Sequence, residues 1–561
     1  MKLFLVNPRL MDARINEYDT ASVPVGLYYL AAESKKQGHD VTLVNLAVEN
    51  LPQQHLKQLL EREKPDLVGF SVLNANRAGA VDGAKLVKSV LPHTTVVFGG
   101  PCATFLADFF LQSVPQVDFV VAGEGERTLT ELVRAMESGS SEDVEQIPGL
   151  VYLKEGRPFR TAERERIDNL DDLPDPSEIY GFAHLAFSRG CPGNCRFCGS
   201  PAFWGRGCVR FHSAGWAADQ VERLYNKGIT HFFFSDDTFT MKKDRVIKLC
   251  RALAERDLPI TFNVISRVDF IDEEMLFHLR KAGCIQISFG VESGSDRIRR
   301  ALGKPVKTDR IINAFDLAAG YGILPRAYFI YGAPGETQET IEESVELLLR
   351  IRPLSAIFHM LTVFPGTSFY HGLLQENRVT DRVWQQEIED IPWFQADPAL
   401  DFEKVKRFGE RLRKSFFDNL DKFALQVKLV DRVELYPEHA DFLARLAMTF
   451  AFGEYAENPA VQNQQSTARI LFERSLAHAD DAKAYLGLGM MYMKEKNFEK
   501  AAETAHRGIR HFPGDRDLAV CMGVSCMNLG RFDKACFHLE KFKGTPEVDN
   551  YIQICREKQN R

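Results

Sequence analysis

Short apolar runs alternate with amphipathic stretches in two parts of this chain, and this alternation limits its possible folds more than any other feature. In residues 1–137, five runs have the length and composition of buried strands, and stretches with helical periodicity follow them. Such alternation predicts a doubly wound α/β domain, in which helices cover both faces of a parallel sheet. The strands are expected at 3–6, 41–46, 67–73, 95–98 and 119–122.

The alternation resumes between residues 179 and 375 with six further strand candidates. Six units predict an incomplete (β/α)6 barrel, with its chemistry at the carboxyl ends of the strands. The five units of the first part match a flavodoxin-like, Rossmann-like domain, whose ligands bind at the same kind of edge. The barrel strands are expected at 184–187, 231–235, 260–264, 284–289, 326–331 and 356–363.

Three other segments differ in character. Residues 138–178 are polar, and their closely spaced prolines and acids disfavour helix and strand, so we expect a linker. Residues 376–433 favour a helical connector. Residues 434–561 carry a period typical of tetratricopeptide repeats, which predicts an all-α, TPR-like domain. One repeat shows Tyr485, Leu488, Gly489, Tyr492, Phe498, Ala501 and Pro513, and Gly523, Phe532 and Ala535 recur thirty-four residues after their counterparts.

Charge and hydropathy argue against two classes of partner. Lys and Arg number 70 against 77 Asp and Glu, a net charge of -7, so the basic excess of a nucleic-acid-binding protein is absent. No stretch approaches the roughly 18 apolar residues of a membrane helix. The apolar run at 3–6 is too short for an export signal, so we expect a cytoplasmic protein. In that compartment the 11 cysteines are expected to be metal ligands or buried small residues rather than disulfides.

Three cysteines follow the first expected barrel strand in the pattern C-x3-C-x2-C. Cys191, Cys195 and Cys198 lie on one tight loop and can hold three irons of a [4Fe–4S] cluster, which leaves the fourth iron open to a small molecule. Zinc is the alternative, because Cys208 and His212 could supply a fourth ligand. Four cysteines near the C-terminus are better explained as core packing than as a second cluster. They are Cys521, Cys526, Cys536 and Cys555.

At the cysteine loop, including the aromatic Phe197, the chain resembles the radical S-adenosylmethionine (SAM) enzymes. Further matches end the following strands at 234–239, 266–269, 290–295, 331–337 and 364–367. The resemblance implies that SAM chelates the open iron through its amine and carboxylate. It also implies that Asp236 or Asp237 meets the amine, and that Arg267 and Glu292 lie near the ribose or the carboxylate. The family's Gly-Gly-Glu at the second strand is replaced here by Ser-Asp-Asp. Each acid alone could instead cap a helix.

The order of flavodoxin-like domain, linker and barrel resembles the cobalamin-binding class of these enzymes, over about residues 1–375. In that class a Ser-x-Leu and a Gly-Gly contact the benzimidazole tail, and a Gly-Glu turn follows the fifth strand. The histidine that ligates cobalt in many cobalamin proteins is missing, because residues 7–24 contain none. The alternative is a structural domain without a cofactor. The residues implied to bind cobalamin are Ser71, Leu73, Gly99, Gly100, Gly123 and Glu124.

The resemblance implies a cobalamin-dependent radical SAM methyltransferase. One SAM would methylate cobalamin, and another would yield a 5′-deoxyadenosyl radical that activates an unreactive carbon. A cyclisation or oxidative rearrangement with the same cofactors is the alternative, and a redox-sensing binding protein is a third possibility that the open iron disfavours. Expected partners are a small-molecule or peptide substrate, a flavodoxin or ferredoxin as electron donor, and a protein at the repeat domain. The expected domains are 1–137, 138–178, 179–375, 376–433 and 434–561.

Overall fold

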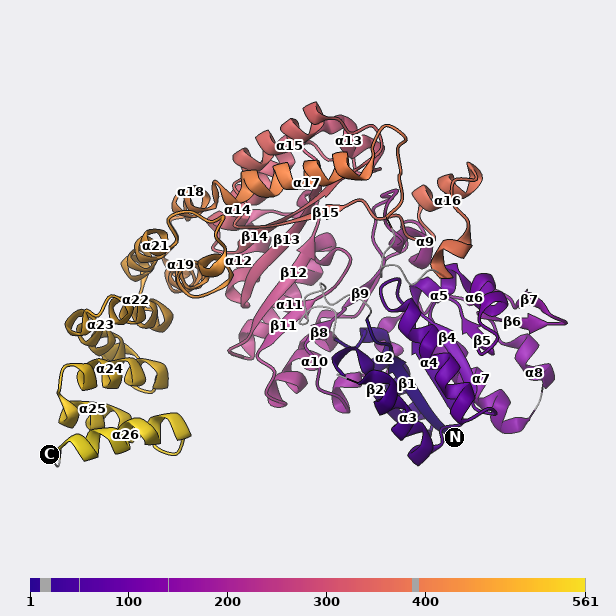
Figure 1. Cartoon of the computed structure of the whole chain (residues 1–561), viewed down its shortest axis with the longest axis horizontal. Coiled ribbons are helices and arrows are strands. Elements are labelled where there is room, and N and C mark those ends of the chain that lie inside the picture. The colour runs from indigo at the N-terminus through magenta and orange to yellow at the C-terminus, as the bar shows by residue number, and fades with distance from the viewer. Residues whose placement is uncertain (11–21, 50, 140, 386–392, 560–561) are drawn as a thin grey trace.

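The computed structural model of the chain describes residues 1–10, 22–49, 51–139, 141–385 and 393–559. Its barrel lies between an N-terminal α/β domain and a row of C-terminal helices (Figure 1). None of the described helices combines the length and the hydropathy needed to cross a membrane.

The N-terminal domain has the strand order β2-β1-β3-β4-β5, all parallel, which confirms the flavodoxin-like prediction. Its strands bury apolar side chains on both faces of the sheet, and these pack with the covering helices as two separate cores. The strands are β1 (Lys2–Asn7), β2 (Asp40–Asn45), β3 (Leu67–Ser71), β4 (Thr95–Gly99) and β5 (Phe119–Val121). The helices are α2 (Val25–Lys36), α3 (Pro52–Glu63), α4 (Arg77–Val90), α5 (Pro101–Phe105), α6 (Ala107–Ser113) and α7 (Gly125–Ser138).

The segment expected to be an irregular linker extends this sheet instead. After α8 (Ser141–Gln146), β6 (Leu150–Lys154) pairs antiparallel with β5, and β7 (Arg157–Arg160) pairs antiparallel with β6. The expectation of no strand in residues 138–178 is therefore wrong. Glu155 and Gly156 make the hairpin turn with φ of 52° and 76°, the left-handed pair that a two-residue hairpin loop requires.

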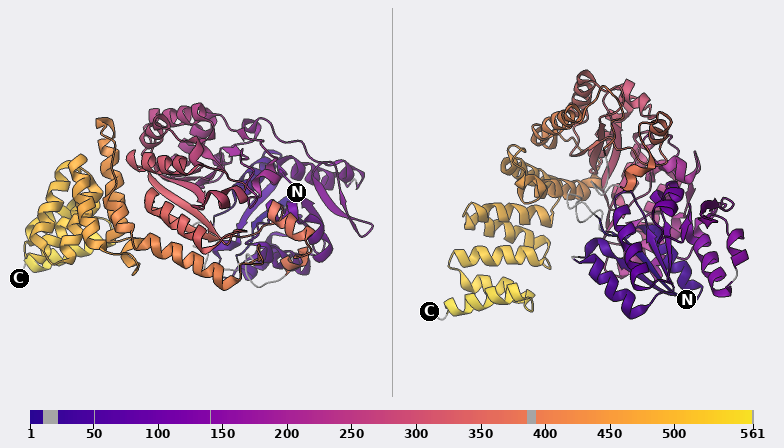
Figure 2. Two further views of the ribbon diagram at one scale, coloured as in Figure 1. Left: turned by 90° about the horizontal axis from the view of Figure 1, so that it is seen from above. Right: turned by 45° about the vertical axis from the view of Figure 1, so that its right-hand side comes forward.

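The barrel sheet has the order β15-β14-β13-β12-β11-β8 and is parallel throughout, as predicted (Figure 2). Its strands are β8 (His184–Leu185), β11 (His231–Phe234), β12 (Thr261–Ser266), β13 (Cys284–Glu292), β14 (Leu324–Tyr331) and β15 (Ser355–Met360). Its helices are α10 (Ala214–Asn226), α11 (Lys243–Glu255), α12 (Glu273–Lys281), α13 (Asp296–Ala301), α14 (Thr308–Gly320) and α15 (Gln338–Ile351). A separate antiparallel pair, β9 (Ser188–Arg189) and β10 (Arg210–Phe211), encloses α9 (Ser200–Trp204).

Beyond the barrel the described chain is helical, and consecutive helices from α21 onward stack in layers (Figure 2). Cys521, Cys526 and Cys555 are buried in one apolar core there, as expected for packing residues. The tetratricopeptide assignment stays a prediction. The helices are α16 (Ser368–Gln375), α17 (Phe402–Phe417), α18 (Leu420–Leu425), α19 (Tyr436–Ala451), α20 (Glu454–Glu457), α21 (Gln464–His478), α22 (Ala482–Lys494), α23 (Phe498–His511), α24 (Arg516–Asn528), α25 (Phe532–Leu539) and α26 (Pro546–Gln559).

Candidate active site

A cavity of about 330 Å³ lies where the carboxyl edge of the N-terminal sheet faces the barrel. Its lining combines small and apolar residues of β1, β3, β4 and α2 with barrel residues that include Phe203 and Trp204. All six residues predicted to bind cobalamin line it: Ser71, Leu73, Gly99, Gly100, Gly123 and Glu124. Sequence reasoning therefore located the cavity correctly, although which of these residues touch a ligand stays a prediction.

Glycines keep this cavity open. A Cβ placed on Gly26 or Gly123 would meet no atom within 4 Å, so a side chain there would fill the cavity. Gly100 has φ +94°, and a Cβ there would lie 3.0 Å from the carbonyl oxygen of Val72, so only glycine fits this turn without strain. A wide apolar cavity floored by glycine backbone suits a large flat ligand with an aromatic tail, and the residues present therefore fit cobalamin.

The cysteine loop begins directly beside this cavity. Ser188 and Arg189 line the cavity, and the β9–β10 pair closes the base of the loop that Cys191 starts. A Cβ placed on Gly193 would lie 3.4 Å from the Cys191 sulfur and 3.7 Å from the Cys195 sulfur. These two sulfurs thus converge on the same side of the loop.

The three thiols are open to ligation, although burial favours the protonated form of Cys195 and Cys198 until a metal binds. All three are half-buried and free of disulfides. Burial raises the pKa of the Cys195 thiol, and it raises that of Cys198 to about 11. In the described residues, no three His, Cys, Asp or Glu side chains are arranged to hold a single metal ion. In a [4Fe–4S] cluster each of the three sulfurs would bind a different iron.

The structure argues against the zinc alternative, because its proposed fourth ligands are engaged elsewhere. His212 has a side chain only 1% exposed, with Nδ1 3.0 Å from Asp171 Oδ1 and Nε2 3.1 Å from the Tyr29 hydroxyl. Both ring nitrogens are thus occupied. The Cys208 sulfur accepts a hydrogen bond from Arg166 Nη1 at 3.2 Å.

The two candidate ligands for the SAM amine have different surroundings. Asp236 is fully buried and accepts hydrogen bonds from the Ser188 hydroxyl and from the Phe187 amide, the latter at 3.2 Å. Burial raises the pKa of its carboxyl. Asp237 is exposed, and the one hydrogen bond that its carboxylate accepts from a described residue comes from the Ser200 hydroxyl, at 2.6 Å. Asp237 therefore has the freer carboxylate at this strand end.

Glu292 ends β13 in a conformation that is uncommon for a non-glycine residue, with φ +64°. Its carboxylate pairs with Lys304 Nζ at 2.7 Å, and both side chains are under 10% exposed. A Cβ on Gly290 would overlap both groups, at 2.4 Å and 2.3 Å, so glycine is required beside the pair. Lys304 was not found from the sequence, because nothing in a Gly-Lys-Pro turn shows that its lysine points inward.

Arg267 connects the third strand end with the cysteine loop. Its Nη2 donates to Asp269 at 2.6 Å, and its Nη1 would lie 3.1 Å from a Cβ on Gly193. Its Nε is buried without a hydrogen-bond partner among the described residues. A buried guanidinium with a free donor beside the cysteines suits an anionic group such as a carboxylate.

Glu124, predicted to contact a cofactor, is instead occupied by protein groups. It accepts hydrogen bonds from Arg189 at 2.5 Å, from Arg210 at 2.8 Å and from the Ile167 amide at 3.0 Å. Burial opposes its ionisation, but hydrogen bonds from the two arginines outweigh this and hold its pKa below the usual range. Arg189 also pairs with Glu126 at 2.6 Å. These ion pairs clamp the N-terminal domain to the base of the cysteine loop.

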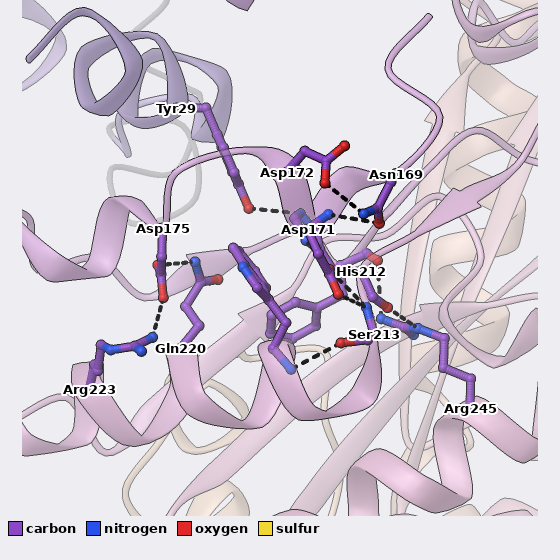
Figure 3. A network of polar contacts seen from close by, with 12 residues as sticks. Tyr29, Asn169, Asp171, Asp172, Asp175, His212, Ser213, Gln220, Arg223 and Arg245 are labelled. Atoms are coloured by element: carbon purple, nitrogen blue, oxygen red, sulfur yellow. Dashed lines mark hydrogen bonds and ion pairs between the residues drawn. The ribbon is translucent and has the colours of Figure 1, made fainter. Parts of the chain in front are cut away.

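A second network, which neighbours the first because the Arg189 guanidinium lies 5.7 Å from the centroid of the Tyr29 ring, joins three parts of the chain (Figure 3). Tyr29 comes from α2 and lines the cavity, His212 belongs to the barrel, and Asp171 belongs to the segment between the domains. Trp216 stacks on His212 with ring centroids 3.7 Å apart. Burial lowers the pKa of His212 to about 4, so the ring is neutral at pH 7. The acidic segment therefore docks on the barrel rather than forming a free tether.

Two family models match the two domains that enclose the cavity. The Radical SAM superfamily model matches residues 185–348, and the B12 binding domain model matches residues 12–133. The predicted cofactors, a [4Fe–4S] cluster, SAM and cobalamin, are confirmed at the level of these domains.

Known proteins resemble the chain over much of its length. The uncharacterized methyltransferase PH0819 of Pyrococcus horikoshii is 30% identical over 79% of this chain and 97% of its own length. The anaerobic magnesium-protoporphyrin IX monomethyl ester cyclase of Cereibacter sphaeroides is 28% identical over 64% of this chain and 61% of that enzyme. The structure of the methyltransferase TsrM from Kitasatospora setae, with cobalamin and a [4Fe–4S] cluster bound, shares the fold with a TM-score of 0.63, at 17% identity, over 85% of this chain and 99% of that one. With both domains matched and a relative covered almost completely, the chain belongs to the cobalamin-binding radical SAM enzymes.

Proposed function

We propose that this enzyme transfers a methyl group from SAM to an unactivated carbon of its substrate. The observation that carries the proposal is the junction at Ser188 and Arg189, which line the cobalamin cavity and directly precede the cysteine loop. A radical formed at that loop and a methyl group carried in the cavity would therefore act on one substrate between them. The long match to a protein named as a methyltransferase supports this choice.

The residues divide into groups with separate tasks. Cys191, Cys195 and Cys198 would hold three irons, and Asp237, Arg267 and Glu292 would hold SAM at the fourth. Residues of the glycine-lined cavity would hold cobalamin and its tail. When bound, these groups supply a 5′-deoxyadenosyl radical and a transferable methyl group. The chain itself would orient both groups. The Glu124–Arg189 ion pair and the His212 network would hold the two domains in a fixed position around them.

The cavity supplies no imidazole to cobalt. Among the described residues that line it there is no histidine, and residues 7–24 contain none in the sequence. A cobalamin held there without an imidazole from the chain would be better suited to supply its methyl group to a carbon radical than to supply it as a cation. We expect electron paramagnetic resonance of the protein with cob(II)alamin to show cobalt hyperfine lines without nitrogen splitting. A triplet splitting on those lines would instead reveal a nitrogen ligand and contradict this part of the proposal.

A reaction without methyl transfer is the second candidate, and it is supported by the similarity to a protein named as a cyclase. Both reactions need the same three cofactors, so the site residues do not separate them. The deciding experiment uses SAM with a deuterated methyl group and an anaerobic extract as the source of substrate. Methyl transfer predicts a product heavier by the labelled methyl group, whereas a product without label would support cyclisation or rearrangement.

Radical SAM enzymes need an external electron donor, because the cluster must be reduced before SAM is cleaved. We propose a flavodoxin or ferredoxin for this role. The substrate is a small molecule or a peptide, and the C-terminal helices are proposed to bind a protein partner. We also propose the cytoplasm as its location, since such donors and a reduced cluster both require a reducing compartment.

A further inference from the structure

The loop that carries the three cysteines has one side open to solvent. Pro192, Asn194 and Arg196 are exposed, whereas the cysteines are half-buried. The turn after α13 packs on this side, because a Cβ on Gly303 would lie 2.8 Å from the Asn194 carbonyl oxygen. The Arg196 guanidinium donates to the carbonyl of Ala301 at 3.2 Å. Each of the exposed residues Pro192, Asn194 and Arg196 is adjacent in sequence to a cysteine, so a partner docked on this side of the loop comes close to the thiols.

Three arginines gather at this point, and we call Arg196, Arg297 and Arg300 the basic patch. Arg297 and Arg300 are three residues apart on α13 and so share one face of the helix. Arg196 reaches the C-terminal end of the same helix. All three are exposed, and none forms an ion pair with a described residue. The acid of this helix, Asp296, is already held by the buried Arg299.

No described acid neutralises the basic patch. Besides its hydrogen bond to the carbonyl of Ala301, the Arg196 guanidinium lies 4.8 Å from the centroid of the Phe369 ring. The nearby lysine that the active site does use, Lys304, turns inward to Glu292. The chain as a whole carries a net charge of -7, so an acidic protein would be repelled by much of the surface. Uncompensated positive charge in such a field attracts an acidic partner and orients its approach.

We propose that the basic patch is the docking surface for the electron donor, a small acidic redox protein of the flavodoxin type. One electron passes from the reduced donor to the oxidised cluster beside Arg196. The donor is oxidised by one electron, the cluster is reduced by one, and no bond is made or broken. The inference rests on the cluster of the proposed function and is independent of methyl transfer.

The test is the rate at which the cluster is reduced, followed by the loss of its visible absorbance. The variant carries Arg196→Gln, Arg297→Gln and Arg300→Gln in the protein with its cluster. With photoreduced flavodoxin at low salt, we expect reduction to slow about tenfold and its salt dependence to flatten. Reduced methyl viologen, a small cationic donor that needs no docking surface, should reduce both proteins equally. Binding of oxidised flavodoxin, measured by calorimetry, should weaken in parallel.

The matched control replaces three exposed arginines away from the cysteine loop, with Arg134→Gln, Arg157→Gln and Arg350→Gln. It removes the same charge and should keep the rate with flavodoxin. Equal slowing in the control would mean that net charge alone matters and would overturn the proposal. So would an unchanged rate in the patch variant, or an equal slowing with methyl viologen. Arg300→Glu alone, whose side chain has no described hydrogen bond, gives the same test with less risk to folding.

Discussion

Replacing Cys191, Cys195 and Cys198 together with alanine is expected to remove the [4Fe–4S] cluster and to abolish formation of 5′-deoxyadenosine. The three half-buried sulfurs are the cluster ligands that the loop offers. The motif contains no further cysteine that could replace them. Iron and sulfide content should fall to background after anaerobic reconstitution, and the reduced protein should lose its electron paramagnetic resonance signal. Deoxyadenosine should fall below detection.

Cys208→Ala is the matched control for this experiment. Cys208 is also half-buried and lies between α9 and β10 on the same loop, but its sulfur bonds to Arg166. We expect this variant to keep a full cluster and full deoxyadenosine formation. Loss of iron in Cys208→Ala would show that Cys208 is a fourth metal ligand, as the zinc alternative assumed. A cluster that survives the triple change would show that the irons are held elsewhere.

Gly26→Leu is expected to weaken cobalamin binding about 10- to 100-fold, because overfilling a fitted site costs roughly 1–3 kcal/mol. Gly26 is the second residue of α2, lines the cavity and has no atom within 4 Å of an added Cβ. The leucine would therefore fit without a clash at its Cβ and, from a position in the cavity lining, would compete with a bound ligand for space. Binding can be measured by the cobalamin that remains with the protein after gel filtration and by titration of its visible spectrum.

Gly215→Leu provides a control with the same local geometry. Gly215 is the second residue of α10 and also has no atom within 4 Å of an added Cβ, but it does not line the cavity. Any gain in helix stability from leucine is common to both variants. Cobalamin binding should be unchanged in this control. If Gly26→Leu binds cobalamin as tightly as the parent protein, then the cavity described here does not hold the cofactor.

The order of the strands was predictable because each is a continuous apolar run followed by a helix, and parallel sheets offer few ways to connect such units. The β6–β7 hairpin was missed because both strands are short and because Arg157–Arg160 contains a proline and two arginines, although Leu150–Lys154 is mainly apolar. Of these two strands, only β7 lies at the edge of the sheet, where a strand buries little surface and its sequence carries a weak pattern. The Glu155-Gly156 pair was the available signal for the turn.

The cavity was predictable in its lining but not in the partners of its charged groups. Ser71, Gly99 and Gly100 follow strand ends, and strand ends of a parallel sheet meet at one edge. Glu124 followed the same rule, yet its carboxylate pairs with Arg189 and Arg210, which come from another domain. A single sequence does not show which residues of one domain face which residues of another, so such ion pairs become visible only in the three-dimensional structure.

The ratio of two products of SAM, measured in one anaerobic reaction with substrate, shows whether this enzyme transfers a methyl group. Radical formation beside the three cysteines yields 5′-deoxyadenosine, and methyl donation to the cavity yields S-adenosylhomocysteine. Methyl transfer to carbon predicts that both accumulate in near-equal amounts, in step with a product that carries the methyl label. Deoxyadenosine that accumulates with an unlabelled product, while S-adenosylhomocysteine stays at background, would contradict methyl transfer and leave the fold and its cofactors unaffected.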